Sequence, residues 1–216
     1  MFLGHLGTGF GAKAAAPKVS LGTLLLAAVL VDLIWPALIL LGVEVVEIRP
    51  GATRATPLDF VYYPFSHSLV AVVVWAGLFS LVYFIVRSYK RGALVVGALV
   101  LGHWLLDAIV HVPDLPLVPG SGLKVGLGLW QSIWGTVLIE LGIFAVGVWL
   151  YVRCTRALDR IGSLGLWALV ALLLLIYSGN FLGGPPPSVA AVAWVGQAQW
   201  LIVLWGYWVD RHRRPA

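Results

Sequence analysis

Long apolar stretches alternate with short polar segments along the whole of this 216-residue chain. Each stretch is close to the roughly 20 residues that an α-helix needs to cross the hydrocarbon core of a bilayer. The apolar residues are continuous rather than alternating, which favours helices over the strands of a membrane barrel. The pattern predicts six spanning helices, near residues 20–42, 67–86, 92–112, 130–152, 163–182 and 189–209.

A shorter apolar segment precedes the first of these stretches. Residues 2–16 are separated from residues 20–41 only by a break that contains Pro17 and Lys18. We expect a helical hairpin here, and therefore a membrane-inserted N-terminal helix beside the six spanning helices. The predicted fold is an all-α, polytopic transmembrane helical bundle in which residues 1–216 form a single transmembrane domain.

The composition supports a membrane protein. Hydrophobic residues make up 61% of the chain and charged residues only 11%, well below the roughly 25% that is typical of soluble domains. The single cysteine, Cys154, excludes an internal disulfide framework and a cysteine-rich metal site.

The basic residues are distributed unequally between the two sets of loops. Eleven of the 14 Lys and Arg residues flank alternate ends of the predicted spans. They are Lys13, Lys18, Arg87, Lys90, Arg91, Arg153, Arg156, Arg160, Arg211, Arg213 and Arg214. By the positive-inside rule these segments and the C-terminus face the cytoplasm, and loops 43–66 and 113–129 face outward. The net charge of +5 is thus explained by topology, and no nucleic-acid partner is expected.

Several ionisable residues interrupt the apolar stretches. At 1.5 Å per residue from the basic boundary, four of them lie at a common depth of about 18 to 24 Å, in the outer half of the membrane. These four are His5, Asp32, His103 and Asp107. His67 and His111 lie at about 30 Å, near the outer surface. His111 also shares one helix face with His103 and Asp107, because the three are spaced four residues apart.

Ionisable groups inside a bilayer are costly unless they pair with one another or bind an ion. Imidazole and carboxylate groups suit Zn²⁺, and also Mn²⁺ or Fe²⁺. We therefore predict a divalent-metal site, most typically zinc, in the half formed by residues 1–112, with residues 130–209 as the C-terminal helical half. The predicted metal ligands are His5, Asp32, His67, His103 and Asp107, and the predicted catalytic residues are His67, His111 and Glu140.

Each of these polar residues also has a plainer interpretation. His103 taken alone could be an interhelical hydrogen-bond partner, and Asp107 could pair with the two histidines of its own helix. Asp32 could accept hydrogen bonds near Pro36, and His5 could lie at the surface of a frayed terminus. Glu140, near the middle of its span, could serve as a general base, a proton relay, a ligand or a structural partner.

Four short motifs occur in a recognisable order within the first half of the chain. They are Gly4-His5, Asp32, "FSHSL" at 65–69 and "GHWLLD" at 102–107. This order resembles the YdjM-like family of membrane-bound metal-dependent hydrolases, a bacterial inner-membrane group, over about residues 1–115. The resemblance implies that His5, Asp32, His67, His103 and Asp107 match residues of the family's motifs.

The chain departs from the family pattern at three positions. Ile34 and Trp35 stand where the family has a second Asp and a His, and Tyr62 stands where it has a further His. The remaining residues therefore imply a site for one metal ion rather than two, with His111 as a compensating group.

The expected function is a membrane-embedded metal-dependent hydrolase of the bacterial inner membrane. Its expected substrate is an ester, phosphoester or amide of a lipid-like or membrane-associated molecule near the outer face. Two alternatives remain open at this point. Buried His and Asp residues also occur in proton- or ion-coupled permeases, and the polar layer could instead hold together a non-catalytic membrane assembly partner.

Overall fold

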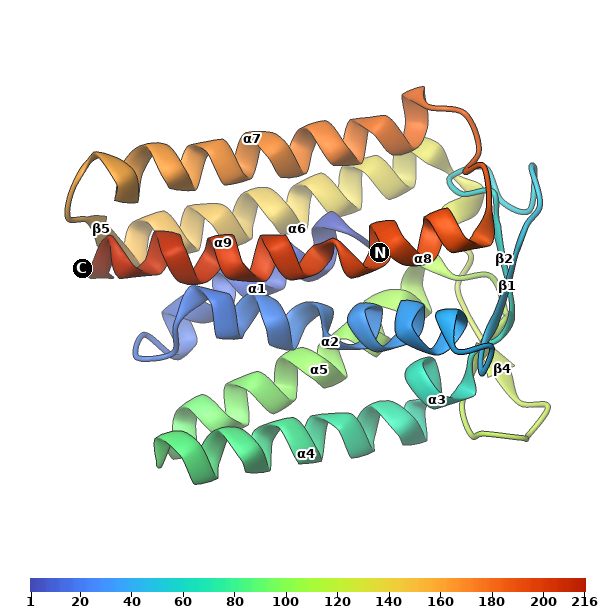
Figure 1. Ribbon diagram of the computed structural model, residues 1–216, viewed down its shortest axis with the longest axis horizontal. Helices are drawn as coiled ribbons and strands as arrows, with labels where there is room; N and C mark the ends of the chain where they lie inside the picture. The colour runs from blue at the N-terminus through green and yellow to red at the C-terminus, as the bar shows by residue number, and fades with distance from the viewer.

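The computed structural model describes residues 1–216 and shows a bundle of long helices lying roughly side by side (Figure 1). The helices are α1 (Leu3–Ala15), α2 (Leu21–Leu40), α3 (Pro64–His67), α4 (Leu69–Arg87), α5 (Lys90–Val110), α6 (Ile133–Cys154), α7 (Arg160–Leu182), α8 (Val189–Gln197) and α9 (Gln199–Arg211). A short 3₁₀ turn, η1 (Leu129–Gln131), precedes α6. The predicted all-α bundle is confirmed.

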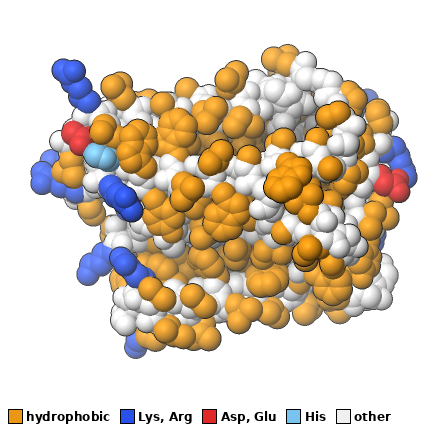
Figure 2. All heavy atoms as spheres, viewed as in Figure 1, with side chains coloured by type: hydrophobic (Ala, Val, Ile, Leu, Met, Phe, Trp, Pro, Cys, Tyr) orange, Lys and Arg blue, Asp and Glu red, His pale blue; other side chains and the backbone are white.

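Six helical segments are long and apolar enough to cross a membrane, with α8 and α9 counted together as one. They coincide with the six predicted spans to within a few residues. Many of the large apolar side chains on these helices are exposed, for example Val86 on α4 and Trp134 on α6, and they form a broad apolar surface (Figure 2). Lipid is the environment that such a surface requires, and the protein is a multi-pass integral membrane protein.

The two ends of the bundle differ in structure and in charge. At one end the long loops form two strand pairs: β1 (Val45–Ile48) pairs antiparallel with β2 (Leu58–Tyr62), and β3 (Leu115–Pro116) with β4 (Lys124–Val125). We call this the hairpin end. At the other end β5 (Thr155–Ala157) pairs with β6 (Arg213–Pro215), and Lys and Arg side chains gather there (Figure 2). We call this the basic end.

The second helix occupies the centre of the bundle. Its sequence is apolar on nearly every side, as is typical of a helix that is surrounded by others. It packs against α1, α5, α8 and α9, and Leu24, Ala28 and Val31 on it are buried. Asp32 therefore lies in the interior of the protein rather than on its lipid-facing surface.

The first helix, α1, is short and lies inside the bundle, as the predicted helical hairpin requires. It begins near the middle of the bundle and runs to the basic end (Figure 1). It packs most extensively on α6, where Gly7 meets Gly147 so closely that a Cβ on Gly147 would overlap the carbonyl oxygen of Gly7. Small residues at a helix crossing allow this backbone approach, and it places His5 deep inside the bundle.

The last predicted span, 189–209, differs from the expectation of one continuous helix because it is broken at Ala198 between α8 and α9. The break faces the part of α2 that contains Pro36, which has no N–H to donate to the carbonyl of Asp32. The side-chain amide of Gln197 donates to the carbonyl of Leu33 (2.9 Å), and that of Gln199 to the carbonyl of Asp32 (3.4 Å). The broken span thus satisfies backbone groups near the proline, which is how such interruptions are tolerated inside membranes.

The expected depth of His67 near the outer surface is wrong. The expectation assumed that His67 begins the long helix, but α4 begins at Leu69 and His67 belongs to the separate turn α3. Ser68, in an extended conformation (φ −67°, ψ 147°), separates the two helices. This break lets α3 fold toward α2, so that His67 reaches the same layer as Asp32 and His103.

Candidate metal centre

Three helices bring two imidazoles and two carboxylates together in the interior. Asp32 comes from α2, His67 from α3, and His103 and Asp107 from successive turns of α5. The Nε2 atoms of His67 and His103 each lie 3.6 Å from Oδ1 of Asp32. They lie 3.8 Å and 3.1 Å, respectively, from Oδ2 of Asp107. We call these four residues the metal-ligand set.

Three of these residues form a group that could hold a divalent cation, because single ligand atoms of Asp32, His67 and His103 all lie within 4.8 Å of one another. Zinc binds nitrogen and oxygen at about 2.0 to 2.1 Å, so four ligands at the corners of a tetrahedron lie about 3.3 Å apart. The four nitrogen–oxygen distances above, from 3.1 to 3.8 Å, bracket that value. Asp107 forms a second such group with His5 and His103, so the candidate ligands make two overlapping groups that share His103.

The hydrogen bonding of His103 is consistent with a ligand. Its Nε2 atom is buried and has no hydrogen-bond partner, although Asp107 lies only 3.1 Å away. A buried polar atom without a partner is costly, and a cation between His103 and Asp107 would satisfy both. The chemistry of the donor set, with two imidazoles, two carboxylates and no thiolate, also suits zinc, manganese or iron.

Each histidine of the metal-ligand set is oriented through its other ring nitrogen. Nδ1 of His103 donates to the backbone carbonyl of Ala28 on α2 (2.8 Å). Nδ1 of His67 lies 2.7 Å from the hydroxyl of Ser66, which in turn donates to Oε2 of Glu44 (2.6 Å). These contacts fix Nε2 as the free nitrogen of both rings, which is the arrangement that metal-binding histidines usually have.

Glu44 holds the turn that carries His67. Its Oε1 accepts hydrogen bonds from the backbone N–H groups of Phe65 (2.8 Å) and Ser66 (2.9 Å). The carboxylate is only 2% exposed although it lies in a loop at the hairpin end. Sequence reasoning missed Glu44 and Ser66 as site residues, because no pattern in the loop distinguishes Glu44 from its exposed neighbour Glu47.

His5 touches the site from the far side of Asp107. Its Nε2 donates to Oδ1 of Asp107 (3.0 Å), the same oxygen that accepts from the amino group of Met1 (2.8 Å). The His5 ring also stacks on His103, with ring centroids 3.6 Å apart. His5 also forms a group with His103 and Asp107 that could hold a metal ion, so its role as a ligand stays a prediction.

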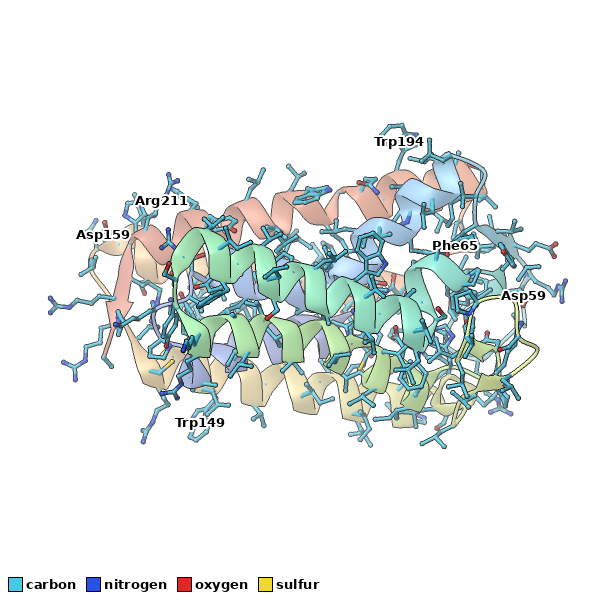
Figure 3. All side chains as sticks on the ribbon, turned by 90° about the horizontal axis from the view of Figure 1, so that it is seen from below. Asp59, Phe65, Trp149, Asp159, Trp194 and Arg211 are labelled. Atoms are coloured by element: carbon cyan, nitrogen blue, oxygen red, sulfur yellow. The ribbon has the colours of Figure 1, made fainter.

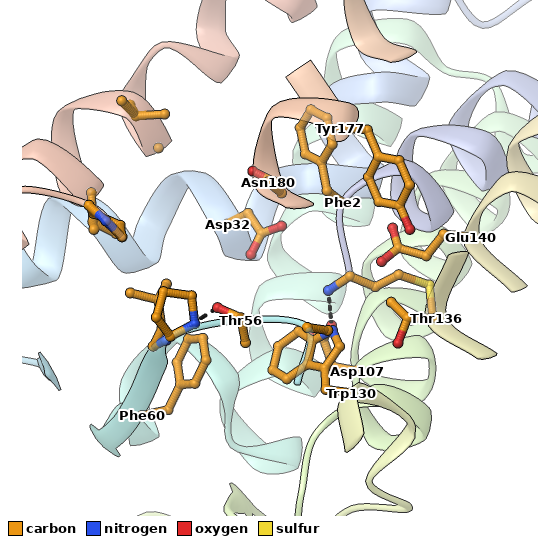
Figure 4. Close-up of a pocket in the computed structure, with 18 of the residues that line it drawn as sticks. Phe2, Asp32, Thr56, Phe60, Asp107, Trp130, Thr136, Glu140, Tyr177 and Asn180 are labelled. Atoms are coloured by element: carbon orange, nitrogen blue, oxygen red, sulfur yellow. Dashed lines mark hydrogen bonds and ion pairs between the residues drawn. The ribbon is translucent and has the colours of Figure 1, made fainter. Parts of the chain in front are cut away.

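A cavity of about 340 Å³ adjoins the metal-ligand set (Figure 4). Asp32, His67 and Asp107 line it, together with aromatic side chains such as Trp35, Phe60, Trp130 and Tyr177. No Lys or Arg side chain lines it. A cation held by the ligand set would therefore be accessible to a small molecule in this cavity.

Glu140 and His111, the two further predicted catalytic residues, also line this cavity. Oε2 of Glu140 accepts from the backbone N–H groups of Leu3 (2.8 Å) and Gly4 (3.3 Å), at the start of α1. Figure 4 shows its carboxylate close to the Tyr177 side chain, whose buried hydroxyl has no hydrogen-bond partner. The structure thus places Glu140 on the cavity wall, outside the metal-ligand set.

His111 lies at the C-terminal end of α5 and faces the loops of the hairpin end. Its Nδ1 lies 2.9 Å from Oδ1 of Asp114, and Tyr63 donates to the same carboxylate oxygen (3.1 Å). Burial, and next the charge of Asp114, raise the pKa of Tyr63 above its usual value, so this phenol stays protonated as a donor. The ring of His111 packs on Trp130 and Phe60, and His111 belongs to neither of the groups that could hold a metal ion.

No family model, curated protein or solved structure matches this chain. The resemblance to the YdjM-like hydrolases therefore stays an expectation from short motifs. The functional argument rests on the geometry of the site.

Proposed function

We propose that the protein is a membrane-embedded hydrolase that uses one divalent metal ion, most typically zinc. Its proposed substrate is an ester, phosphoester or amide of a lipid-like molecule at the hairpin end, which we assign to the outer face of a bacterial inner membrane. One observation carries this proposal: ligand atoms of Asp32, His67 and His103, from three helices, lie within 4.8 Å of one another, and Asp107 lies 3.1 Å from His103. Their position beside a cavity is the second requirement of a catalytic site.

Asp32 is the member of the ligand set that is most open to the cavity. Its side chain is 22% exposed, whereas those of His67, His103 and Asp107 are 4% exposed or less. Catalytic metal sites keep one position for water or substrate, and the cavity side of Asp32 offers the room for it. A bound divalent cation would act as a Lewis acid and would lower the pKa of a bound water molecule to about 7.

The proposed proton-transfer groups are side chains on the cavity wall. Glu140 can accept a proton from the attacking group, and the Tyr177 hydroxyl beside it can donate to a substrate oxygen. His111, coupled to Asp114, is the proposed second proton-transfer group at the hairpin end. No Lys or Arg lines the cavity, and the amino group of Met1 in its lining is already paired with Asp107, which favours an ester or amide over a phosphomonoester.

Two walls of the cavity adjoin the lipid-facing surface. Phe181 on α7 and Val195 on α8 line it, and Val195 is 70% exposed on the outer surface of the bundle. This supports entry of an apolar substrate from the bilayer, past α7 and α8.

Metal analysis of the purified protein tests the proposal. We expect about one zinc ion per chain, with His103→Ala losing it because His103 contributes Nε2 to the ligand set. His212→Ala is the matched control, since His212 lies at the basic end, where it contacts Asp159. Equal metal content in His103→Ala and in the wild type would overturn the site.

An activity screen with chromogenic esters, phosphoesters and amides in detergent micelles tests the reaction. We expect hydrolysis that is abolished by a chelator and restored by zinc. Solute flux in proteoliposomes that survives removal of the metal would instead support a permease.

A further inference from the structure

A second cavity lies between α2, α4 and α9, far from the metal centre along the bundle. Its volume is about 520 Å³. It is lined at its mouth by Arg87 and Arg211, which occupy the last turns of α4 and α9 at the basic end. Figure 3 shows Arg211 at that end of the bundle, close to the adjoining end of α4.

The inner part of this cavity is apolar. Leu26 on α2 and Phe79, Val82 and Val86 on α4 line it, and the side chains of Val82 and Val86 are more than half exposed. From Arg87 to Phe79 the wall runs eight residues along α4, about 12 Å into the membrane. The cavity is thus a slot with two cations at the membrane surface and an apolar floor below them.

The two arginines are available to an anion. Neither forms an ion pair, and the one carboxylate in the lining, Asp210, is already engaged. Both of its oxygens accept from Lys13 at 2.9 Å, and the hydroxyl of Tyr151 donates to it at 3.0 Å. The charge that faces the mouth is therefore positive.

Hydroxyl groups complete the mouth of the slot. Tyr207 and Thr23 share a hydrogen bond of 2.8 Å, and Thr23 also contacts the hydroxyl of Ser20 (2.8 Å). All three residues line the cavity, and each hydroxyl can turn to donate to a phosphate oxygen.

We propose that this slot binds an anionic phospholipid from the leaflet at the basic end. The phosphate would contact Arg87 and Arg211, and one acyl chain would lie along Leu26, Phe79 and Val82. Basic pockets between membrane helices bind lipid headgroups in this way, and a free phosphate ion would leave the apolar floor uncovered. The proposal is independent of the hydrolase site, because it involves neither the metal-ligand set nor its cavity.

Thermal unfolding of the full-length protein in a neutral detergent tests the proposal with three probes. The probes are phosphatidylglycerol, phosphatidylcholine of the same chain length, and inorganic phosphate. We expect phosphatidylglycerol to raise the melting temperature most, because it alone combines a net negative headgroup with acyl chains. An equal rise in melting temperature with phosphatidylcholine would show that the slot recognises only acyl chains. An equal rise with inorganic phosphate would show that it recognises only an anion. Either result overturns the proposal.

Paired variants locate the effect. In the double variant Arg87→Gln and Arg211→Gln, we expect the affinity for phosphatidylglycerol to fall roughly tenfold to thirtyfold, as the loss of two interfacial cations predicts. The matched control is Arg153→Gln and Arg156→Gln, which removes the same charge from the basic end outside the slot. An equal loss in the control would show general surface attraction and overturn the proposal. If the double variant does not fold, the single variants Arg87→Gln and Arg211→Gln make the same comparison.

Discussion

Asp107 illustrates how much of the site depends on single atoms. Its two carboxylate oxygens have different partners: Oδ2 faces His103 and His67, and Oδ1 accepts from His5 and from the amino group of Met1. The hydrogen bonds to Oδ1 hold the carboxylate in one rotation. A metal-binding carboxylate is commonly held in this way by hydrogen bonds to its outer oxygen.

Glu44 gives the sharpest test at the scale of single residues. Replacement of Glu44 by Gln puts an amide where the carboxylate accepts hydrogen bonds from Phe65 and Ser66. We expect Glu44→Gln to weaken zinc binding by roughly 10- to 100-fold, the usual effect of disturbing an outer partner of a metal ligand. Competition with a chromophoric chelator measures the change.

The control for this prediction is Glu47→Gln. Glu47 lies three residues further along the same loop, and its side chain is 52% exposed and pairs with Arg49. It should bind zinc as the wild type does. Wild-type affinity in Glu44→Gln would contradict the role that we assign to the contact between Glu44, Ser66 and His67.

At the scale of helices, hydrophobic length alone predicted most of the architecture. The six spans and the inserted first helix follow from apolar runs of the right length, and depth along the helices predicted that His5, Asp32, His103 and Asp107 would meet. The break at Ala198 was not predicted, because its cause is the backbone near Pro36 on another helix. The depth of His67 was predicted wrongly for two reasons. The chain breaks at Ser68 between α3 and α4, and Glu44, which is distant in sequence, holds α3 in place.

The crossing of α1 and α6 carries a prediction about stability. A leucine at Gly147 has no space, because even its Cβ would overlap the carbonyl oxygen of Gly7. We expect Gly147→Leu to destabilise the protein by about 1 to 3 kcal/mol or more, as overpacking does, and to lower the melting temperature. Gly142→Leu on the same helix is the control, since no atom lies within 4 Å of a Cβ there. Equal melting temperatures for the two variants would show that α1 does not pack on α6 as described.

At the scale of the whole molecule, the two ends of the bundle have separate roles in the proposals above. The metal-ligand set and its cavity lie toward the hairpin end, where β2 and the loop before it contribute to the lining. The two free arginines and the apolar slot lie at the basic end. A substrate of the proposed hydrolase and a bound anionic lipid would therefore come from opposite leaflets.

The orientation of the bundle in the membrane determines whether the hairpin end faces the outer or the inner leaflet. Labelling of single cysteines measures this orientation. In a Cys154→Ser background, Gly122→Cys places a thiol in the exposed loop between β3 and β4, and Ala216→Cys places one at the exposed C-terminal residue of the basic end. Because basic loops stay in the cytoplasm, we expect a membrane-impermeant thiol reagent to label Gly122→Cys in intact spheroplasts. The same reagent should label Ala216→Cys only after the membrane is permeabilised. The reverse pattern would place the candidate metal centre toward the cytoplasm, and the proposed substrate would then have to come from the inner leaflet.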